Sequence, residues 1–240
     1  MKRVFFLLLL CLLFFYLPLF SQPDDAAAIL DTASKKLVFG QDVSMKITLR
    51  YEESVVGEYI LFRRDKSSTA LLLQQKPGSM NGTGYLFLSG TLWLYNPVCR
   101  CFESSYKSRR AAGNFLMFAD ILPFTLKKED TAEKAREKEI FGEKTHVLEC
   151  YAAEDMYSVR MYLSKKTGLP VYREYLNDQG NVTSSSTLLM YGEYGKQYIP
   201  IHFLVQTADG RKVEITCSDI SIHPLPDAVF TKSYLLEITR

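Results

Sequence analysis

The chain has 240 residues, of which 47% are hydrophobic and 23% are charged, and its formal net charge is +2. This length and composition are typical of one large globular domain or two small ones. Because Lys2 and Arg3 supply the excess positive charge, the remainder carries 27 basic and 27 acidic residues. A balanced charge excludes the strongly basic surface by which proteins bind nucleic acid.

Residues 1–21 are predicted to be a secretory signal peptide. Two basic residues precede an uncharged apolar run at 4–20, and Ser21 stands before a polar segment. Cleavage after Ser21 would leave 22–240 as a single exported domain. The apolar run is also close to the shortest length that spans a membrane, so an uncleaved, membrane-anchored form is the alternative.

Residues 24–38 are predicted to form a helix, because two acids precede a run of alanines and apolar residues then recur at helical spacing. After Gly40 the period changes to two. Met45, Ile47 and Leu49 alternate with polar residues, which predicts a half-buried strand. Further strand-like runs follow at 56–64, 69–75, 84–88 and 91–95.

The second half is also predicted to be a succession of strands separated by turns such as Asp209-Gly210. With about eleven strands and almost no helices between them, we expect an antiparallel sheet that curls and has a concave face. The expected strands lie at 145–151, 157–163, 170–176, 186–192, 198–206 and 211–220.

The middle of the chain has a different pattern of apolar and polar residues. Residues 115–124 are largely apolar, and between two sets of strands they are expected to be either part of the core or a flexible lid. Residues 127–138 favour a helix by propensity but are polar all round, which argues against a stable isolated helix.

Four cysteines lie beyond the leader: Cys99, Cys101, Cys150 and Cys217. A disulfide between Cys99 and Cys101 would close a small strained ring, so we expect a link from one of them to Cys150 or Cys217, or free buried thiols. A zinc site is disfavoured because no second cysteine pair or histidine cluster accompanies the C-x-C motif.

The sequence does not indicate an enzyme. His146, His202 and His223 lie apart in strand-like runs, and no zinc-protease or serine-hydrolase motif is present. Gly82-Thr83-Gly84 lacks the third glycine and the helix of a phosphate-binding loop. We therefore expect no catalytic residue, no metal and no cofactor.

Several segments, in this order and spacing, resemble the LolA family of periplasmic lipoprotein carriers, within the broader group of outer membrane lipoprotein-sorting proteins. "GTLWLYNP" resembles the family's strand-and-turn motif, and "EYILFRR" resembles the strand that carries an arginine at the cavity mouth. "VRMYLSKKTGLPVYREYLNDQGNV" and "ISIHPLPDAVF" resemble later family segments. The resemblance covers nearly all of residues 24–239.

The resemblance implies a mainly β domain, a large antiparallel sheet curled into an unclosed half-barrel and covered by an N-terminal helix and a short apolar lid. It implies an apolar cavity for acyl chains, with Trp93 and Tyr95 in its wall while Leu92 and Leu94 pack elsewhere. Arg64 is the residue that aligns with the mouth arginine, although Asp65 in place of a family proline also allows it to pair with Asp65. The full set of expected cavity residues is Met45, Ile47, Leu49, Trp93, Tyr95, Phe115, Met117, Phe118, Val159 and Met161.

The function that the resemblance implies is that of a periplasmic carrier delivering acyl chains of lipids or lipoproteins toward the outer membrane. Its partners would be these acyl chains and membrane-bound donor and acceptor proteins, and a monomer is expected. The alternative is a non-transporting module in the periplasm that senses lipid or binds a protein.

Overall fold

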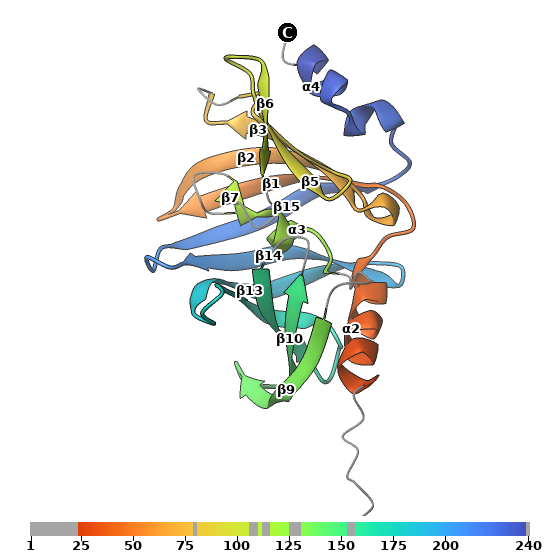
Figure 1. Cartoon of the computed structure of the whole chain (residues 1–240), viewed down its shortest axis with the longest axis vertical. Helices are drawn as coiled ribbons and strands as arrows, with labels where there is room; N and C mark the ends of the chain where they lie inside the picture. Colours follow the sequence, from red (N-terminus) through yellow and green to blue (C-terminus); the bar gives the residue numbers. More distant parts are fainter. Residues whose placement is uncertain are drawn as a thin grey trace, which may run out of the picture.

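The computed structural model describes residues 24–78, 81–105, 110–111, 116–124, 131–152 and 157–238. Most of them form one antiparallel sheet of thirteen strands that is curled but not closed (Figure 1). In chain order the strands are β1 (Val43–Tyr51), β2 (Ser54–Arg64), β3 (Thr69–Lys76), β4 (Gly84–Leu88), β5 (Thr91–Asn96), β6 (Cys101–Ser105), β9 (Thr131–Ile140), β10 (Glu143–Ala152), β11 (Tyr157–Ser164), β12 (Pro170–Leu176), β13 (Val182–Tyr194), β14 (Gln197–Thr207) and β15 (Lys212–Ile222).

The strand order across the sheet is β6-β5-β4-β3-β2-β1-β15-β14-β13-β12-β11-β10-β9. Every neighbouring pair except β1 and β15 follows in sequence, so the sheet consists of two meanders joined where β1 pairs with β15. Strands β6 and β9 are therefore the two edges, although they are consecutive strands of this sheet in the chain. The connection between them contains a small ribbon of β7 (Arg110–Ala111) and β8 (Leu116–Met117), followed by the short helix α3 (Phe118–Ile121).

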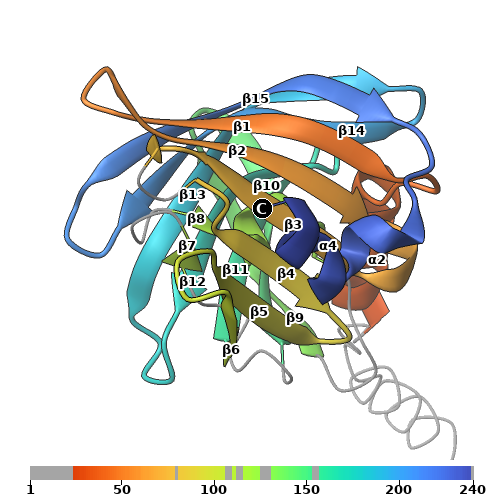
Figure 2. The ribbon, with the colours of Figure 1, turned by 90° about the horizontal axis from the view of Figure 1, so that it is seen from above.

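The described part of this connection lies within the curve of the sheet, as Figure 2 shows for β7 and β8. The N-terminal helix α2 (Asp24–Leu37) packs on the same face, where Ala26, Leu30 and Ala33 meet residues of β10, β11 and β12. The concave face is thus covered by one helix and by residues 116–124.

The apolar side chains of the central strands follow the expected period of two. Met45, Ile47 and Leu49 of β1 point to the concave face and are at most 4% exposed. Their cluster extends over β2, β3, β4, β14 and β15 and includes Leu116, Ile121 and Leu122 of the covering segment. Side chains of alternate residues point to opposite faces, so one buried layer fills the inside of the curl.

A second layer covers the outer face of strands β2 to β6. It consists of the 3-10 turn η3 (Asp227–Phe230) and the helix α4 (Lys232–Ile238), whose Leu235 is fully buried against Leu71, Leu86 and Tyr95. A side chain at Gly84 would collide with Leu235, so glycine allows the helix to approach the sheet closely.

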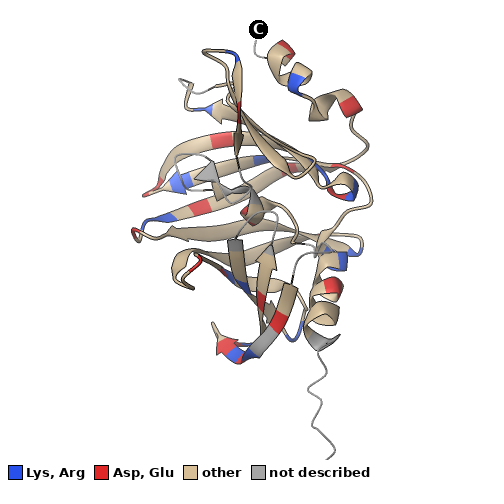
Figure 3. Cartoon of the chain, viewed as in Figure 1, with Lys and Arg blue, Asp and Glu red and all other residues tan. Residues whose placement is uncertain are grey.

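The structure confirms the predicted N-terminal helix and the predicted strands, and it adds strands at both edges. Strand β6 was not expected, and the helical propensity of residues 127–138 is overruled at 131–140, which form β9. This segment pairs with β10 along nearly its whole length, and ladder hydrogen bonds outweigh the small propensities of single residues. Charges of both signs run along β9 (Figure 3), a composition that protects an edge strand from pairing with other chains.

The prediction that Cys99 or Cys101 is linked to Cys150 or Cys217 was wrong. Cys99 and Cys101 are bonded to each other, whereas Cys150 and Cys217 are free. A strained ring is expected only where the backbone between the two cysteines is extended, but Cys99 lies in the turn before β6, and Arg100 between them has a φ of +54°. This turn brings the two Cα atoms to 5.3 Å, a separation that a disulfide spans.

We expect Leu235→Ala to lower the free energy of unfolding by about 2–4 kcal/mol, because it removes a fully buried leucine from the outer layer. Ile238→Ala, on the same helix, is the control, since Ile238 is 40% exposed and should cost well under half as much. Urea unfolding at pH 7 measures both. Equal losses for the two variants would show that α4 does not contribute a buried layer.

Candidate functional site

The concave face and the segment that covers it form the candidate site. Of the residues expected to line a cavity, Met45, Ile47 and Leu49 point into the main concave cluster. Val159 and Met161 are 1% exposed and lie in the neighbouring cluster, against α2 and Ala119. The two clusters together make the inside of the curl apolar across both meanders.

Strand β5 has the opposite orientation from the one expected. Leu92 is in the concave cluster with Leu94 packed against it, whereas Tyr95 and Trp93 lie in the outer layer beneath η3 and α4. Lys232 of α4 stands over the Trp93 ring, with its Nζ atom 2.9 Å from the ring centroid. The prediction that Trp93 and Tyr95 wall the cavity is therefore corrected. Both faces of β5 are buried under separate layers, which explains why the strand is apolar on both sides.

The predicted lid residues are placed only in part. Phe115 lies outside the described residues, and for Met117 and Phe118 the structure describes the backbone but not the side chains. Their neighbours Leu116, Ile121 and Leu122 are buried in the concave cluster. We refer to residues 116–124 as the plug, because this segment fills the concave face.

A buried arginine fixes one side of the plug. Arg63 of β2 is 2% exposed and donates hydrogen bonds to the carbonyl oxygens of Ile121 in the plug, at 3.1 Å, and of Leu37 at the end of α2, at 3.4 Å. Its Nε atom is 2.8 Å from Oδ1 of Asp65, whose other oxygen accepts a hydrogen bond from the Phe39 amide. Burial lowers the pKa of Arg63 and raises that of Asp65. Arg63 thus joins the sheet, the helix end and the plug at one buried point.

A second group of buried polar side chains fixes the other side of the plug. Arg173 of β12 donates a hydrogen bond to the carbonyl oxygen of Ala119 at 3.2 Å. Asp120 of α3 is 3% exposed and accepts hydrogen bonds from the Tyr175 hydroxyl, at 2.9 Å, and from the Ser186 hydroxyl. Polar contacts therefore hold the plug on an otherwise apolar face.

One small void lies beneath the plug among the described residues. A void of about 10 Å³ is lined by residues of α2, β2, β12, β14 and the plug. Arg63 and Arg173 both border it, as do Asp120 and Leu122. The plug and the acyl chain expected from the sequence would therefore compete for the same surface.

The structure assigns Arg64, at the end of β2, to a clasp that joins the segment before β1 to the segment after β15. Its guanidinium binds both carboxylate oxygens of Asp42, at 2.9 and 2.8 Å, and also contacts Asp227 and the Leu225 carbonyl. It stacks over the Phe230 ring at 4.6 Å. The pairing with Asp65, which the sequence left open for Arg64, belongs to Arg63. Arg64 is thus engaged within the chain, and the arginine that contacts the plug is its neighbour.

Three important polar residues of the site were not named from the sequence: Arg63 as the plug contact, Arg173 and Asp120. The sequence pattern does indicate that the two arginines point inward. Arg63 is two residues from Leu61, and Arg173 two residues from Tyr175, so each has the parity of an inward-facing residue. A charged residue in an apolar row is a candidate for a buried polar contact.

The described residues contain no group of three or more His, Cys, Asp or Glu side chains that could hold a metal ion. Two histidines lie near carboxylates, His202 at 2.7 Å from Glu214 and His146 at 4.0 Å from Glu137. None of the helices within the described ranges is both long enough and apolar enough to span a membrane.

Comparison with known proteins agrees with this architecture. A family model described as "Uncharacterized protein" matches residues 66–237, which is well over half of the chain. The chain belongs to this family. Comparison with curated proteins gave no match.

Several solved structures share this fold at low sequence identity. An outer membrane lipoprotein-sorting protein domain from Vibrio parahaemolyticus is 18% identical, with a TM-score of 0.77 over 91% of this chain and 100% of that one. A LolA superfamily protein from Nitrosomonas europaea is 20% identical, with a TM-score of 0.71 over 87% and 99%. A DUF1329 family protein from Desulfovibrio piger is 18% identical, with a TM-score of 0.72 over 87% and 98%. The resemblance seen in the sequence is confirmed at the level of the fold.

The clasp gives a pH-dependent prediction. The hydrogen bond from Arg64 lowers the pKa of Asp42 below its ordinary value of 3.8. A depressed carboxylate pKa stabilises the folded state above the unfolded pKa, and this stability is lost as the pH falls through the folded pKa. Asp42→Asn should therefore cost about 2 kcal/mol at pH 7 and progressively less below pH 3.8.

Denaturant unfolding at several pH values measures this difference. Asp178→Asn, at an exposed turn, is the control and should change stability little throughout. A cost for Asp42→Asn that stays constant down to the acid limit would contradict the assignment of the clasp.

Proposed function

We propose that this protein is a periplasmic carrier that binds acyl chains of lipids or lipoproteins on its concave face and delivers them toward the outer membrane. In this proposal the plug moves aside when cargo enters, and no covalent step or cofactor is involved. The donor and the acceptor of the cargo are membrane-bound proteins.

The observation that carries the proposal is the way the plug is attached. The concave face is apolar across both meanders, but the segment covering it is held by Arg63, Arg173, Tyr175 and Ser186. These side chains belong to the sheet and contact the plug through its backbone carbonyls and Asp120. Such contacts can be exchanged for water when the plug lifts, which leaves an apolar surface able to receive acyl chains.

The energies of the two occupants are comparable. An acyl chain with about fourteen buried methylenes gains roughly 11 kcal/mol before the costs of ordering it. Burial of Leu116, Ile121 and Leu122 in the plug contributes about 1.5–3 kcal/mol each, and each polar contact adds about 1 kcal/mol. Release of an acyl chain directly into water would be slow. The plug competes effectively with the cargo for the concave face, and this competition allows the cargo to be released.

Mass spectrometry of an organic extract tests the proposal directly. The full chain would be exported to a bacterial periplasm and purified without detergent. Stoichiometric phospholipid or acylated peptide supports the carrier and identifies its cargo. An extract without lipid, from a protein that unfolds cooperatively, would instead support the alternative of a non-transporting module in the periplasm that senses lipid or binds a protein.

Weakening the attachment of the plug should make it open more often. Tyr175→Phe removes one of the two hydroxyls that donate to Asp120, and we expect about tenfold faster opening, equivalent to the net loss of one hydrogen bond. Tyr162→Phe is the matched control, because the Tyr162 hydroxyl donates to Glu174 away from the plug.

Cys217 provides the readout. This partly buried thiol packs against the concave cluster, and burial raises its pKa to about 12, which makes it slow to react. The rate of alkylation at Cys217, mapped by mass spectrometry, should rise in Tyr175→Phe and remain unchanged in Tyr162→Phe. The same rate in both variants would show that the Asp120 contacts do not hold the plug.

A further inference from the structure

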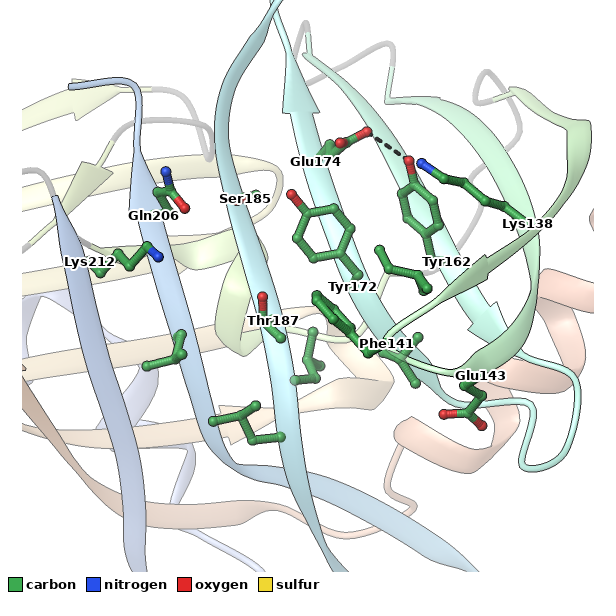
Figure 4. Close-up of a pocket in the computed structure, with 15 residues that line it drawn as sticks. Lys138, Phe141, Glu143, Tyr162, Tyr172, Glu174, Ser185, Thr187, Gln206 and Lys212 are labelled. Carbon is green, nitrogen blue, oxygen red and sulfur yellow. Dashed lines mark hydrogen bonds between the residues drawn. The ribbon is translucent and has the colours of Figure 1, made fainter. Parts of the chain in front are cut away.

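A groove with a volume of about 790 Å³ crosses the outer face of the second meander (Figure 4). Its side chains include Tyr162 and Glu174, which alternate along their strands with Met161 and Tyr175 of the concave layer. Alternate residues point to opposite faces, so the groove lies on the other side of the sheet from the plug. The carrier function proposed above does not use this groove.

One row of the groove is aromatic and apolar. Tyr172 lies near its centre and contacts the Tyr162 ring at 5.2 Å and the Phe141 ring at 6.0 Å between centroids. Phe141 stands at the turn between β9 and β10 and is 70% exposed. In the register of the sheet, Tyr172 is followed by Thr187 and then Leu204. An outer sheet face normally carries polar side chains, so an accessible aromatic row here requires a reason.

The neighbouring row is polar. In register, Glu174 is followed by Ser185, Gln206 and Lys212 across four strands. Glu174 is already engaged, because it binds Arg160 at 2.9 Å and accepts a hydrogen bond from Tyr162 at 3.0 Å.

Several polar groups in and beside these rows have no partner. Among the described residues, the Tyr172 and Thr187 hydroxyls, the Gln206 amide and the Lys212 ammonium make no side-chain hydrogen bond. Figure 4 shows the Tyr172 hydroxyl in the open groove between Ser185 and Glu174. These groups can serve a ligand rather than the fold.

The cations that line the groove are separate lysines. Lys212 and Lys138 stand on opposite sides of it (Figure 4), and neither has an acidic partner within the described ranges. Both acids of the groove have partners: Glu174 binds Arg160, and Glu143 accepts a hydrogen bond from the Ser164 hydroxyl. The nearby Arg160 is held between Glu149 and Glu174, which leaves separate lysines as the available cations. A lysine is a compact point charge, so each of the two separate lysines can pair with one anionic group of an extended ligand.

We propose that this groove binds an oligosaccharide that carries carboxylates, such as a chain of uronic acids. The C–H faces of pyranose rings are weakly positive and pack on the negative faces of aromatic rings, here Tyr172 and Phe141. Sugar hydroxyls pair with the free hydroxyls and the amide of the groove, and carboxylates pair with Lys138 and Lys212. Strands β11 to β15 span four strand spacings, about 19 Å, which fits a chain of several sugar rings rather than one.

Titration calorimetry with tetragalacturonate and with its methyl ester tests the proposal on the full chain. We expect tetragalacturonate to bind and the uncharged ester to bind about tenfold more weakly, because it loses the charge-assisted contacts to lysine. Lys212→Gln should weaken tetragalacturonate binding about fivefold to tenfold while leaving the ester unaffected. Lys196→Gln, at the exposed turn between β13 and β14, is the matched control and should change neither affinity.

Tyr172→Ala tests the aromatic row and should weaken both ligands at least tenfold, because it removes the stacking surface. Tyr198→Ala on β14 is its control, and circular dichroism confirms that each variant is folded. The proposal is overturned if folded wild-type protein does not bind tetragalacturonate, or if Lys212→Gln and Tyr172→Ala bind it as the wild type does. Because the groove and the plug lie on opposite faces, a failure here leaves the lipid extraction result unaffected.

Discussion

The connection between β6 and β9 has to travel from one edge of an open sheet to the other. The two strands are consecutive members of the sheet in the chain, but eleven strands separate them in space. A sheet that curls without closing leaves only its concave side as a short path between its edges. The plug lies inside the curl for this topological reason, and the apolar side chains of 116–124 match the surface that the path must cross.

Covering an apolar face with a short segment creates a difficulty, because a segment of this size leaves backbone carbonyls buried without partners. The chain solves it with arginines on two different strands: Arg63 serves the Ile121 carbonyl, and Arg173 serves that of Ala119. Asp120 is satisfied in turn by hydroxyl donors. The buried charges therefore satisfy backbone carbonyls of the plug, and they make its attachment dependent on directional contacts.

Much of the architecture could be predicted from the sequence, because the period of two along β1 assigns Met45, Ile47 and Leu49 to one face. The orientation of β5 could not, since Leu92, Trp93, Leu94 and Tyr95 are all apolar and both faces are buried. Family resemblance placed the mouth arginine at Arg64, one residue from the side chain that contacts the plug. Adjacent residues on a strand point to opposite faces. A shift of one position therefore selects Arg64, which forms the clasp, instead of Arg63, which contacts the plug. Strand β9 was not predicted because its sequence shows no alternation of apolar and polar residues. Its place at the edge of the sheet is set by pairing with β10.

The pairing of β1 with β15 affects how the protein folds. Val43 lies opposite Ile222, so the contact that unites the two meanders joins segments separated by most of the chain. Closing so long a loop costs more entropy than forming hairpins between successive strands, and such non-local pairings slow folding. Each meander can form its hairpins early, but the sheet cannot be completed until β15 has been synthesised. A chain with this topology therefore lacks its central seam until long after β1 has been synthesised.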